Sequence, residues 1–421
     1  MMSDFPVHVL VAAAIVFGCS APRGVYGQGV PHCVAETRMV DGIPHVLNPS
    51  TPIGATRIIP MESVWSYELT ETDDRLPPIG TISRVVMSGD SLIYMLDTQG
   101  GQVLEFSPIQ GYLGVLIRPG EGPGEINGAI DVACTLTGDV SVARRQPGEI
   151  VVFGRRGQKK KTQVKLTQDG ILGFVTLDRI ERSGTGFLVR GSAMRVKGGA
   201  QEVCSFLSVL GKDGVERGNL LRKCTAMANL VTGKGIKEIG DVSLAKFACG
   251  KWIYLVEDPN DYVVKVFDAE GRMQRIFGRE FQRRRYSDAE REEIRAVYAK
   301  MLKKVPLARS ILDSEPPTLA PAIVSLVARR NGRLWVLPER DAGSSGAYTP
   351  FTYDVFDEDG CYRERIQLEG DEVGSGNIAY VLENYVVMLR GLVNLPAGAT
   401  VSADEQDVPR RISCYRMIQP N

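Results

Sequence analysis

Histidine is almost absent from the 421-residue chain and does not occur beyond its first 45 positions. The three histidines are His8, His32 and His45. A site in the remaining chain would have to work without imidazole, which excludes histidine-based zinc sites and Ser-His-Asp triads there. Excess charge is lacking as well, because 50 Lys and Arg residues balance 50 Asp and Glu residues. Since general nucleic-acid binding rests on neutralising phosphates, zero net charge argues against a nucleic-acid partner.

Long apolar runs are also missing, and no segment reaches the 18 residues typical of a membrane-spanning helix. The longest run near the start is VLVAAAIVFG, residues 9–18, which suits the core of a signal peptide. We therefore expect residues 1–27 to be a signal peptide, or a lipoprotein signal that ends before Cys19. The expected location is exported, periplasmic or extracellular, with membrane contact only through a lipid on Cys19. An unprocessed apolar segment is the alternative.

None of the eight cysteines has C-x-x-C spacing, which argues against zinc-ribbon and thioredoxin sites. Export would permit disulfides. Cys204 with Cys224 would staple one hairpin region, and Cys361 with Cys414 would join sequential repeats. The alternative is that these residues are buried free thiols acting as small apolar side chains.

One pattern recurs along the chain: an apolar strand that ends in Phe or Leu, followed by a short turn that ends in Gly. The strands end at Phe106, Phe153, Leu210, Phe267 and Phe356. Gly supplies the positive φ that tight hairpin turns need. Short apolar runs, typical of buried strands, lie between these turns. A repeat of about 50 residues in an all-β chain predicts the blades of a propeller.

We predict an all-β, six-bladed β-propeller over residues 57–418, preceded by an N-terminal extension over residues 28–56. The segment ESVWSYEL, residues 62–69, alternates like a strand but has no blade of its own. We expect this N-terminal strand to complete the last blade and close the ring, which removes an open sheet edge.

A helical insertion interrupts the repeat within residues 282–318. Ser287 and Glu290 form a capping box, and apolar residues at helical spacing follow it. The predicted helix spans about residues 286–305. It either packs against the propeller, covers the channel or docks a partner.

The stretch IRPGEGPGE, residues 117–125, has glycines at every second position. A dinucleotide-binding loop requires a strand, a glycine turn and then a helix, whereas this stretch lies between two strand blocks. Pro123 lacks an N–H donor, and Glu121 and Glu125 bring negative charge where a phosphate would sit. We therefore interpret the stretch as a corner between blades.

The segment VLEFSPIQGYLGVLIRPGEGPGEI, residues 103–126, resembles the blade-closing pattern of bacterial exported six-bladed β-propeller proteins related to the NHL repeat. The segments VVKVFDAEGRMQRIFGRE and YDVFDEDGCYRERIQL resemble later blades of the same family. The resemblance covers roughly residues 60–418. It implies a propeller fold, export and a binding role. Related lactonases and lyases hold metals on the propeller axis, usually with several converging Asn, Asp, Glu or His residues.

Six apolar runs end in a charge at an equivalent position, and we expect these charges to ring the mouth of the central channel. They are Asp97, Arg144, Arg190, Glu257, Glu339 and Arg390. One interpretation is that they form ion pairs between blades. The other is that Arg144 and Arg190 bind a carboxylate or sulfate, for which arginine forks are suited.

Asp131 and Asp178 lie on predicted innermost strands and are weak candidates for a Ca²⁺ site. No other cofactor is indicated. The sequence predicts a non-catalytic exported platform that binds a protein, peptide or glycan. The alternative is a calcium- or zinc-dependent lactonase, hydrolase or lyase with its site at the central channel.

Overall fold

The computed structural model describes residues 35–70, 75–154, 159–166, 171–231, 235–304, 316–339, 351–370, 377–392 and 410–418. They belong to one unit, Cys33–Asn421. The expected signal peptide and Cys19 lie outside the described residues. No helix among the described residues is long and apolar enough to cross a membrane.

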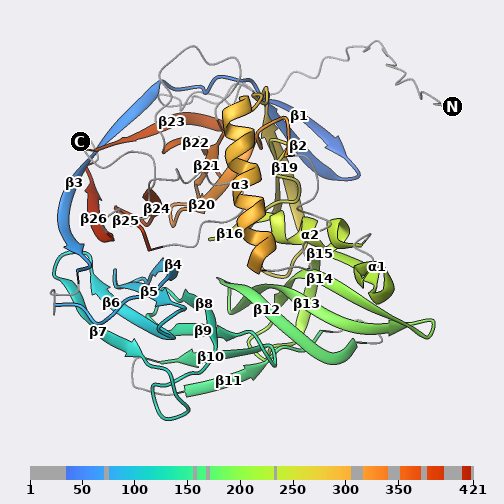
Figure 1. Cartoon of the computed structure of the whole chain (residues 1–421). Helices are drawn as coiled ribbons and strands as arrows, with labels where there is room; N and C mark the ends of the chain where they lie inside the picture. The colour runs from blue at the N-terminus through green and yellow to red at the C-terminus, as the bar shows by residue number, and fades with distance from the viewer. Residues whose placement is uncertain are drawn as a thin grey trace, which may run out of the picture. The chain divides into compact units, whose positions relative to one another are not determined.

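The chain is a β-propeller, built from antiparallel strand sets that follow one another along the sequence (Figure 1). Blade 1 contains β4 (Ile82–Met87), β5 (Ile93–Asp97), β6 (Gln102–Ser107) and β7 (Gly111–Ile117). Blade 2 contains β8 (Ala129–Cys134), β9 (Val140–Arg144), β10 (Glu149–Phe153) and β11 (Lys159–Gln163). Blade 3 contains β12 (Ile171–Ser183), β13 (Gly186–Lys197), β14 (Ala200–Leu210) and β15 (Glu216–Ala226). Blade 4 contains β16 (Lys246–Cys249), β17 (Ile253–Val256), β18 (Val263–Phe267) and β19 (Met273–Arg279).

The remaining strands form one eight-stranded sheet with two halves. One half is β20 (Ile323–Ala328), β21 (Leu334–Pro338), β22 (Thr352–Phe356) and β23 (Tyr362–Glu369). The other is β24 (Asn377–Val381), β25 (Tyr385–Arg390) and β26 (Arg411–Met417). We interpret the halves as two further blades, and a total of six stays a prediction.

The N-terminal strand β3 (Thr56–Glu68) joins these two halves. Its first residues pair in parallel with β23, and residues from Met61 onward pair antiparallel with β26. The prediction that this strand completes the last blade is therefore confirmed.

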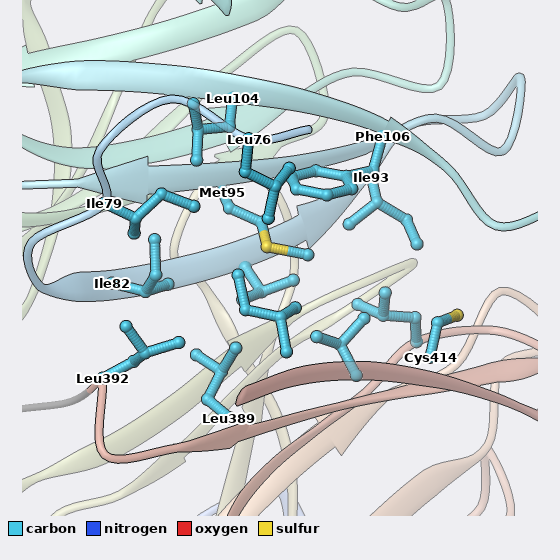
Figure 2. Packing of buried hydrophobic residues seen from close by; sticks show 14 residues of the cluster. Leu76, Ile79, Ile82, Ile93, Met95, Leu104, Phe106, Leu389, Leu392 and Cys414 are labelled. Carbon is cyan, nitrogen blue, oxygen red and sulfur yellow. The ribbon is translucent and has the colours of Figure 1, made fainter. Parts of the chain in front are cut away.

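A shared core shows how the first and last strand sets meet. Figure 2 shows Ile93, Met95 and Phe106 of blade 1 packed with Leu389 of β25 and Cys414 of β26. Alternate residues of a strand point to opposite faces, so each strand contributes to the cores on both of its sides. Between blades 1 and 2, for example, a second cluster contains residues of both. The hydrophobic core therefore lies between neighbouring sheets.

Three features of the fold have no counterpart in the sequence prediction. The N-terminal extension contributes a hairpin, β1 (Glu36–Val40) and β2 (Ile43–Asn48), and β2 pairs in parallel with β19 of blade 4. The strands of blade 3 are 11 to 13 residues long, whereas those of blades 1 and 2 have 5 to 7. Two short helices, α1 (Met227–Val231) and α2 (Ile236–Leu244), follow β15 and contact it.

The predicted insertion forms helix α3 (Asp288–Lys304). Its capping box is present: the Ser287 backbone N–H donates to the Glu290 carboxylate (2.8 Å), and the Glu290 N–H donates to the Ser287 hydroxyl (3.3 Å). Ile294 lies on the buried side of the helix, with 4% of its surface exposed. The predicted insertion and its N-terminal cap are both confirmed.

Of the two proposed disulfides, one is correct and one is wrong. Cys204 and Cys224 are bonded and join β14 to β15. Cys361 is disulfide-bonded too, but Cys414 is a free, buried thiol. Cys414 lies in the apolar core between blade 1 and β24–β26, where burial raises its pKa to about 12. It acts there as a small apolar side chain.

Candidate functional site

The first strand of each set lies innermost and approaches the first strand of the next: β4 contacts β8, β8 contacts β12, β12 contacts β16, and β16 contacts β20 (Figure 1). Charged side chains on these inner strands therefore come from sequence-distant blades to a common axis. Because an apolar inner strand has no packing use for such residues, they are the natural place to look for a site.

Register places the predicted ring charges at equivalent positions. Asp97 pairs with Ile82, Arg144 with Ala129, and Arg390 with Asn377, each the first residue of its inner strand. Arg190 pairs with Arg179 within the longer β12. Glu257 and Glu339 directly follow β17 and β21.

Asp97 has a structural task at this position. Its carboxylate is buried and accepts hydrogen bonds from the backbone N–H groups of Gly80 (3.0 Å), Thr81 (2.9 Å) and Gly100 (3.0 Å). Burial by itself raises the pKa of Asp97, but the Gly80 and Gly100 N–H donors lower it below its usual value. The side chain is fully used in holding the turn that leads into β4.

Four of the other ring charges form ion pairs outside the ring. The pairs are Arg144–Glu149 (3.1 Å), Arg190–Asp178 (2.8 Å), Lys265–Glu257 (2.8 Å) and Arg284–Glu339 (3.1 Å). Among the described residues no ion pair joins two ring charges, and none involves Arg390. Three of the ring charges, Asp97, Arg144 and Arg390, therefore share one register position, but the described ring charges do not pair with one another between blades.

A cluster of charges that the sequence did not reveal joins three blades at the axis. This axial cluster consists of Arg84 on β4, Asp131 on β8, and Arg179 and Glu181 on β12. Arg84 forms an ion pair with Glu181, and its Nε lies 3.8 Å from Asp131. Arg179 Nη2 lies 3.1 Å from Glu181. Side-chain exposure is only 14% for Arg84 and 16% for Glu181, so these charges are paired away from bulk water.

Burial and ion pairing compete in setting the pKa directions of the axial cluster. Burial raises the pKa of Glu181, but the charges of Arg84 and Arg179 outweigh it and lower the pKa below its ordinary value. Burial dominates at Asp131 and raises its pKa, against the opposing charge of Arg84. Arg179 is destabilised as a cation, because burial and the charge of Arg84 both lower its pKa.

The donor set of Asp131 and Asp178 does not suit a calcium ion. Asp131 accepts the Ile180 N–H (2.7 Å) beside Arg84, and Asp178 accepts from Arg190. Calcium needs six to eight oxygen ligands, and neighbouring guanidinium groups repel it. Elsewhere among the described residues, the one close group of ligand atoms comprises Glu202, Cys204 and Cys224, whose sulfurs are bonded to each other.

A cationic group lies beside the axial cluster and has a different character. This cationic mouth consists of Arg179, which it shares with the axial cluster, of Arg190, and of Lys246, the first residue of β16. The Cζ atoms of Arg179 and Arg190 lie 4.8 and 5.6 Å from the Phe247 ring centroid. Arg190 is fixed by Asp178 and by the Ser243 carbonyl (3.0 Å). The two guanidinium groups are therefore held in place before any ligand arrives.

Lys246 is the least compensated member of the cationic mouth. Burial lowers its pKa, and the positive charges of Arg179 and Arg190 lower it further. Within the described part of the chain its ammonium group forms no ion pair. An anion placed beside Lys246 and Arg179 would relieve the repulsion among these cations.

Sequence reasoning missed Arg84, Arg179, Glu181 and Lys246 as site residues. A usable signal was present: charged residues inside innermost strands, a single one in ISRVVM (residues 82–87) and three of five in LDRIE (residues 177–181). Asp131 and Asp178 were placed correctly on inner strands, but their partners are arginines.

No family model and no curated protein matches the chain. Solved structures do match, with low similarity. A protein described as exported, from Bacteroides fragilis, is 10% identical over 86% of this chain and 100% of that one, with a TM-score of 0.42. Regucalcin from Agrobacterium tumefaciens, described as calcium-binding, is 11% identical over 86% and 95%, with a TM-score of 0.37.

Virginiamycin B lyase from Staphylococcus aureus is 10% identical over 84% of this chain and 99% of that one, with a TM-score of 0.34. At this level of similarity none of these proteins carries an argument about what the chain binds or does. The resemblance to NHL-related exported propellers stays a prediction.

Proposed function

We propose that the chain is an exported, six-bladed, non-catalytic binding platform related to NHL-repeat propellers. It would hold the carboxylate or sulfate group of a protein, peptide or glycan at the cationic mouth. The observation that supports this proposal is the set of three neighbouring cations, Arg179, Arg190 and Lys246. Burial and the charge of Arg84 lower the pKa of Arg179, and burial and the charges of Arg179 and Arg190 lower the pKa of Lys246.

The geometry favours binding of an anion over catalysis. Arg190 is held by Asp178 and Ser243, so a bound acid would meet a guanidinium group that is already oriented. Arginine forks bind carboxylate and sulfate groups with two parallel hydrogen bonds, and Lys246 would add a single charge. Rigid donors reduce the entropy lost on binding.

The alternative, a metal-dependent lactonase, hydrolase or lyase, has less support from the described residues. Asp131 and Asp178 each lie beside an arginine that offsets the carboxylate charge, which leaves little negative charge for a divalent cation. The metal content of the purified protein tests this alternative directly. About one tightly held calcium or zinc ion per chain would favour the enzyme and justify lactone and ester substrate screens.

The platform is tested by calorimetric titration of the full chain with oligogalacturonate, sulfate and uncharged dextran. We expect saturable binding of the acidic probes only, and strong weakening in Lys246→Met and Arg190→Gln. Lys265→Met is the matched control, because Lys265 lies on β18 and pairs with Glu257 outside the cationic mouth. Unchanged affinity in Lys246→Met would refute the site, and an unfolded Arg190→Gln would show that its ion pair is structural.

A further inference from the structure

The elongated strands of blade 3 create a feature that the shorter blades lack. The ladder between β13 and β14 continues without interruption from Phe187–Leu210 to Lys197–Ala200. Gly198 and Gly199 close this hairpin with positive φ values of 58° and 80°, as a tight two-residue turn requires. The Cys204–Cys224 disulfide ties β14 to β15 in the extended part. Blade 3 therefore presents a rigid surface beyond the repeat.

A cavity of about 530 Å³ opens on this blade, which is within the usual size range of small-molecule sites. We call it the blade 3 pocket. Its lining, among the described residues, is Arg195, Glu216, Arg217, Gly218, Asn219, Arg222 and Cys224. Three guanidinium groups and one carboxylate face the same space, so the lining carries a net charge of +2. Such a lining favours a polar, acidic ligand over an apolar one.

The polar groups of the pocket are held by one another. The Ser208 hydroxyl donates to the Glu216 carboxylate (2.6 Å) and accepts from the Asn219 amide (3.0 Å). Arg222 forms an ion pair with Glu216, and both side chains are buried, at 10% and 4% exposure. Because each group is fixed by a neighbour, the network is organised before a ligand binds.

Two further arginines, Arg195 and Arg217, line the blade 3 pocket. Arg195 donates its Nε–H to Glu202 (2.6 Å), and its terminal nitrogens bond no other residue of the described part. Arg217 is half-exposed and pairs with Asp213 (2.7 Å) at the turn between β14 and β15. A guanidinium group has five N–H donors, so both arginines keep donors for a ligand acid.

We propose that the blade 3 pocket is a second ligand site, separate from the cationic mouth, for a small hydroxylated acid of the uronic acid type. The arginines would bind the carboxylate. Glu216 would repel a bare anion but accepts hydrogen bonds from hydroxyl groups, and Asn219 adds an amide. A ligand with an acid and hydroxyl groups on one small frame satisfies both parts of the lining.

The test titrates the full chain with galacturonate, galactose and acetate, and follows binding by calorimetry. We expect galacturonate to bind at millimolar concentrations or below, and galactose and acetate to bind at least tenfold more weakly. Arg217→Gln and Arg195→Gln should each weaken galacturonate binding about tenfold or more, as expected for the loss of a charged hydrogen bond. Arg217 is exposed, so its variant reports on binding even if Arg195→Gln fails to fold.

The matched control is Arg272→Gln. Arg272 pairs with Asp268 at the corresponding turn of blade 4, in the same i,i+4 arrangement as Arg217 with Asp213. This variant should bind galacturonate as the parent protein does. The proposal is overturned if galacturonate shows no saturable binding, or if its binding is unchanged in Arg217→Gln. If Lys246→Met lost galacturonate binding while Arg217→Gln and Arg195→Gln kept it, the ligand would bind at the cationic mouth. That result would overturn the blade 3 site and support the binding platform.

Discussion

Arg279 and Asp354 form an ion pair across neighbouring strand sets, with Nη2 and Oδ2 2.7 Å apart and side-chain exposures of 1% and 0%. Arg279 ends β19 of blade 4, and Asp354 lies in β22. The Tyr262 hydroxyl donates to the same carboxylate (2.6 Å), as does the Tyr362 hydroxyl. Both carboxylate oxygens of Asp354 thus accept hydrogen bonds from protein groups. The network therefore fixes how blade 4 packs against the strands β20–β23.

Asp354→Asn should destabilise the protein by about 3 to 5 kcal/mol, because it leaves the buried Arg279 without its main countercharge. Urea unfolding of the parent and variant measures the difference. Glu62→Gln is the control, since Glu62 and Arg416 form a pair with both side chains more than half exposed, and it should change stability little. Equal effects of the two substitutions would contradict a special role for the buried pair.

Stability of the helix α3 cap should fall in acid because of Glu290. Arg284 binds the Glu290 carboxylate with two hydrogen bonds (3.0 and 2.8 Å). These bonds, opposed by burial and helped by Ser287, lower its pKa from 4.5 to about 2. A carboxyl group with a lowered folded-state pKa stabilises the fold above its unfolded-state pKa, and this contribution disappears as pH falls from about 4.5 to about 2.

Hydrogen exchange of the first α3 amides in the parent and in Glu290→Gln measures this effect. The variant should exchange faster at pH 7, and the difference should shrink through that acid window. A difference that is independent of pH would show that the Glu290 charge does not stabilise the cap.

Anion binding at the cationic mouth should weaken at alkaline pH through Lys246. A lysine is charged below its pKa, and burial together with Arg179 and Arg190 lowers the pKa of Lys246. Affinity for oligogalacturonate should therefore fall as pH rises, before the ordinary lysine pKa of 10.5 is reached. Lys246→Arg should bind with little dependence on alkaline pH, because arginine keeps its charge. The same alkaline loss in both proteins would assign the titration to another group.

Removal of the blade 3 disulfide should destabilise the protein by about 3 kcal/mol, the loop-entropy expectation for cysteines 20 residues apart. The double variant Cys204→Ala/Cys224→Ala, unfolded in guanidinium chloride without reductant, gives the measurement. The free thiol Cys134 supplies a control as Cys134→Ala. If the double variant and Cys134→Ala had the same free energy of unfolding, the extended strands would hold blade 3 together without the disulfide.

The repeat could be predicted from the sequence because residues close together in the chain specify each strand and each turn. Apolar runs and glycine turns predicted the strands, and the Ser287–Glu290 spacing predicted the start of helix α3. Residues 62–69 were recognised as the closing strand because they alternate like a strand and had no blade of their own. In each of these cases the signal lies within about ten residues of the structure that it specifies.

The remaining features depend on residues far apart in the chain. Arg84 meets Glu181 across 97 positions, and no local pattern shows that one is the partner of the other. The β1–β2 hairpin pairs with β19, more than 220 residues later, through backbone bonds that most sequences can form. The Cys361–Cys414 pairing was wrong for the same reason, since spacing along the repeat does not tell whether two thiols face each other.

The double pairing of β3 also constrains when the protein can fold. Its pairing with β26 joins Glu62 and Arg416, which are 354 residues apart, so the half of the eight-stranded sheet that contains β24–β26 cannot pair with β3 until β26 has been synthesised. Contacts of such long range form slowly. We expect the growing chain to remain incompletely folded during translation, with unpaired edges open to chaperones.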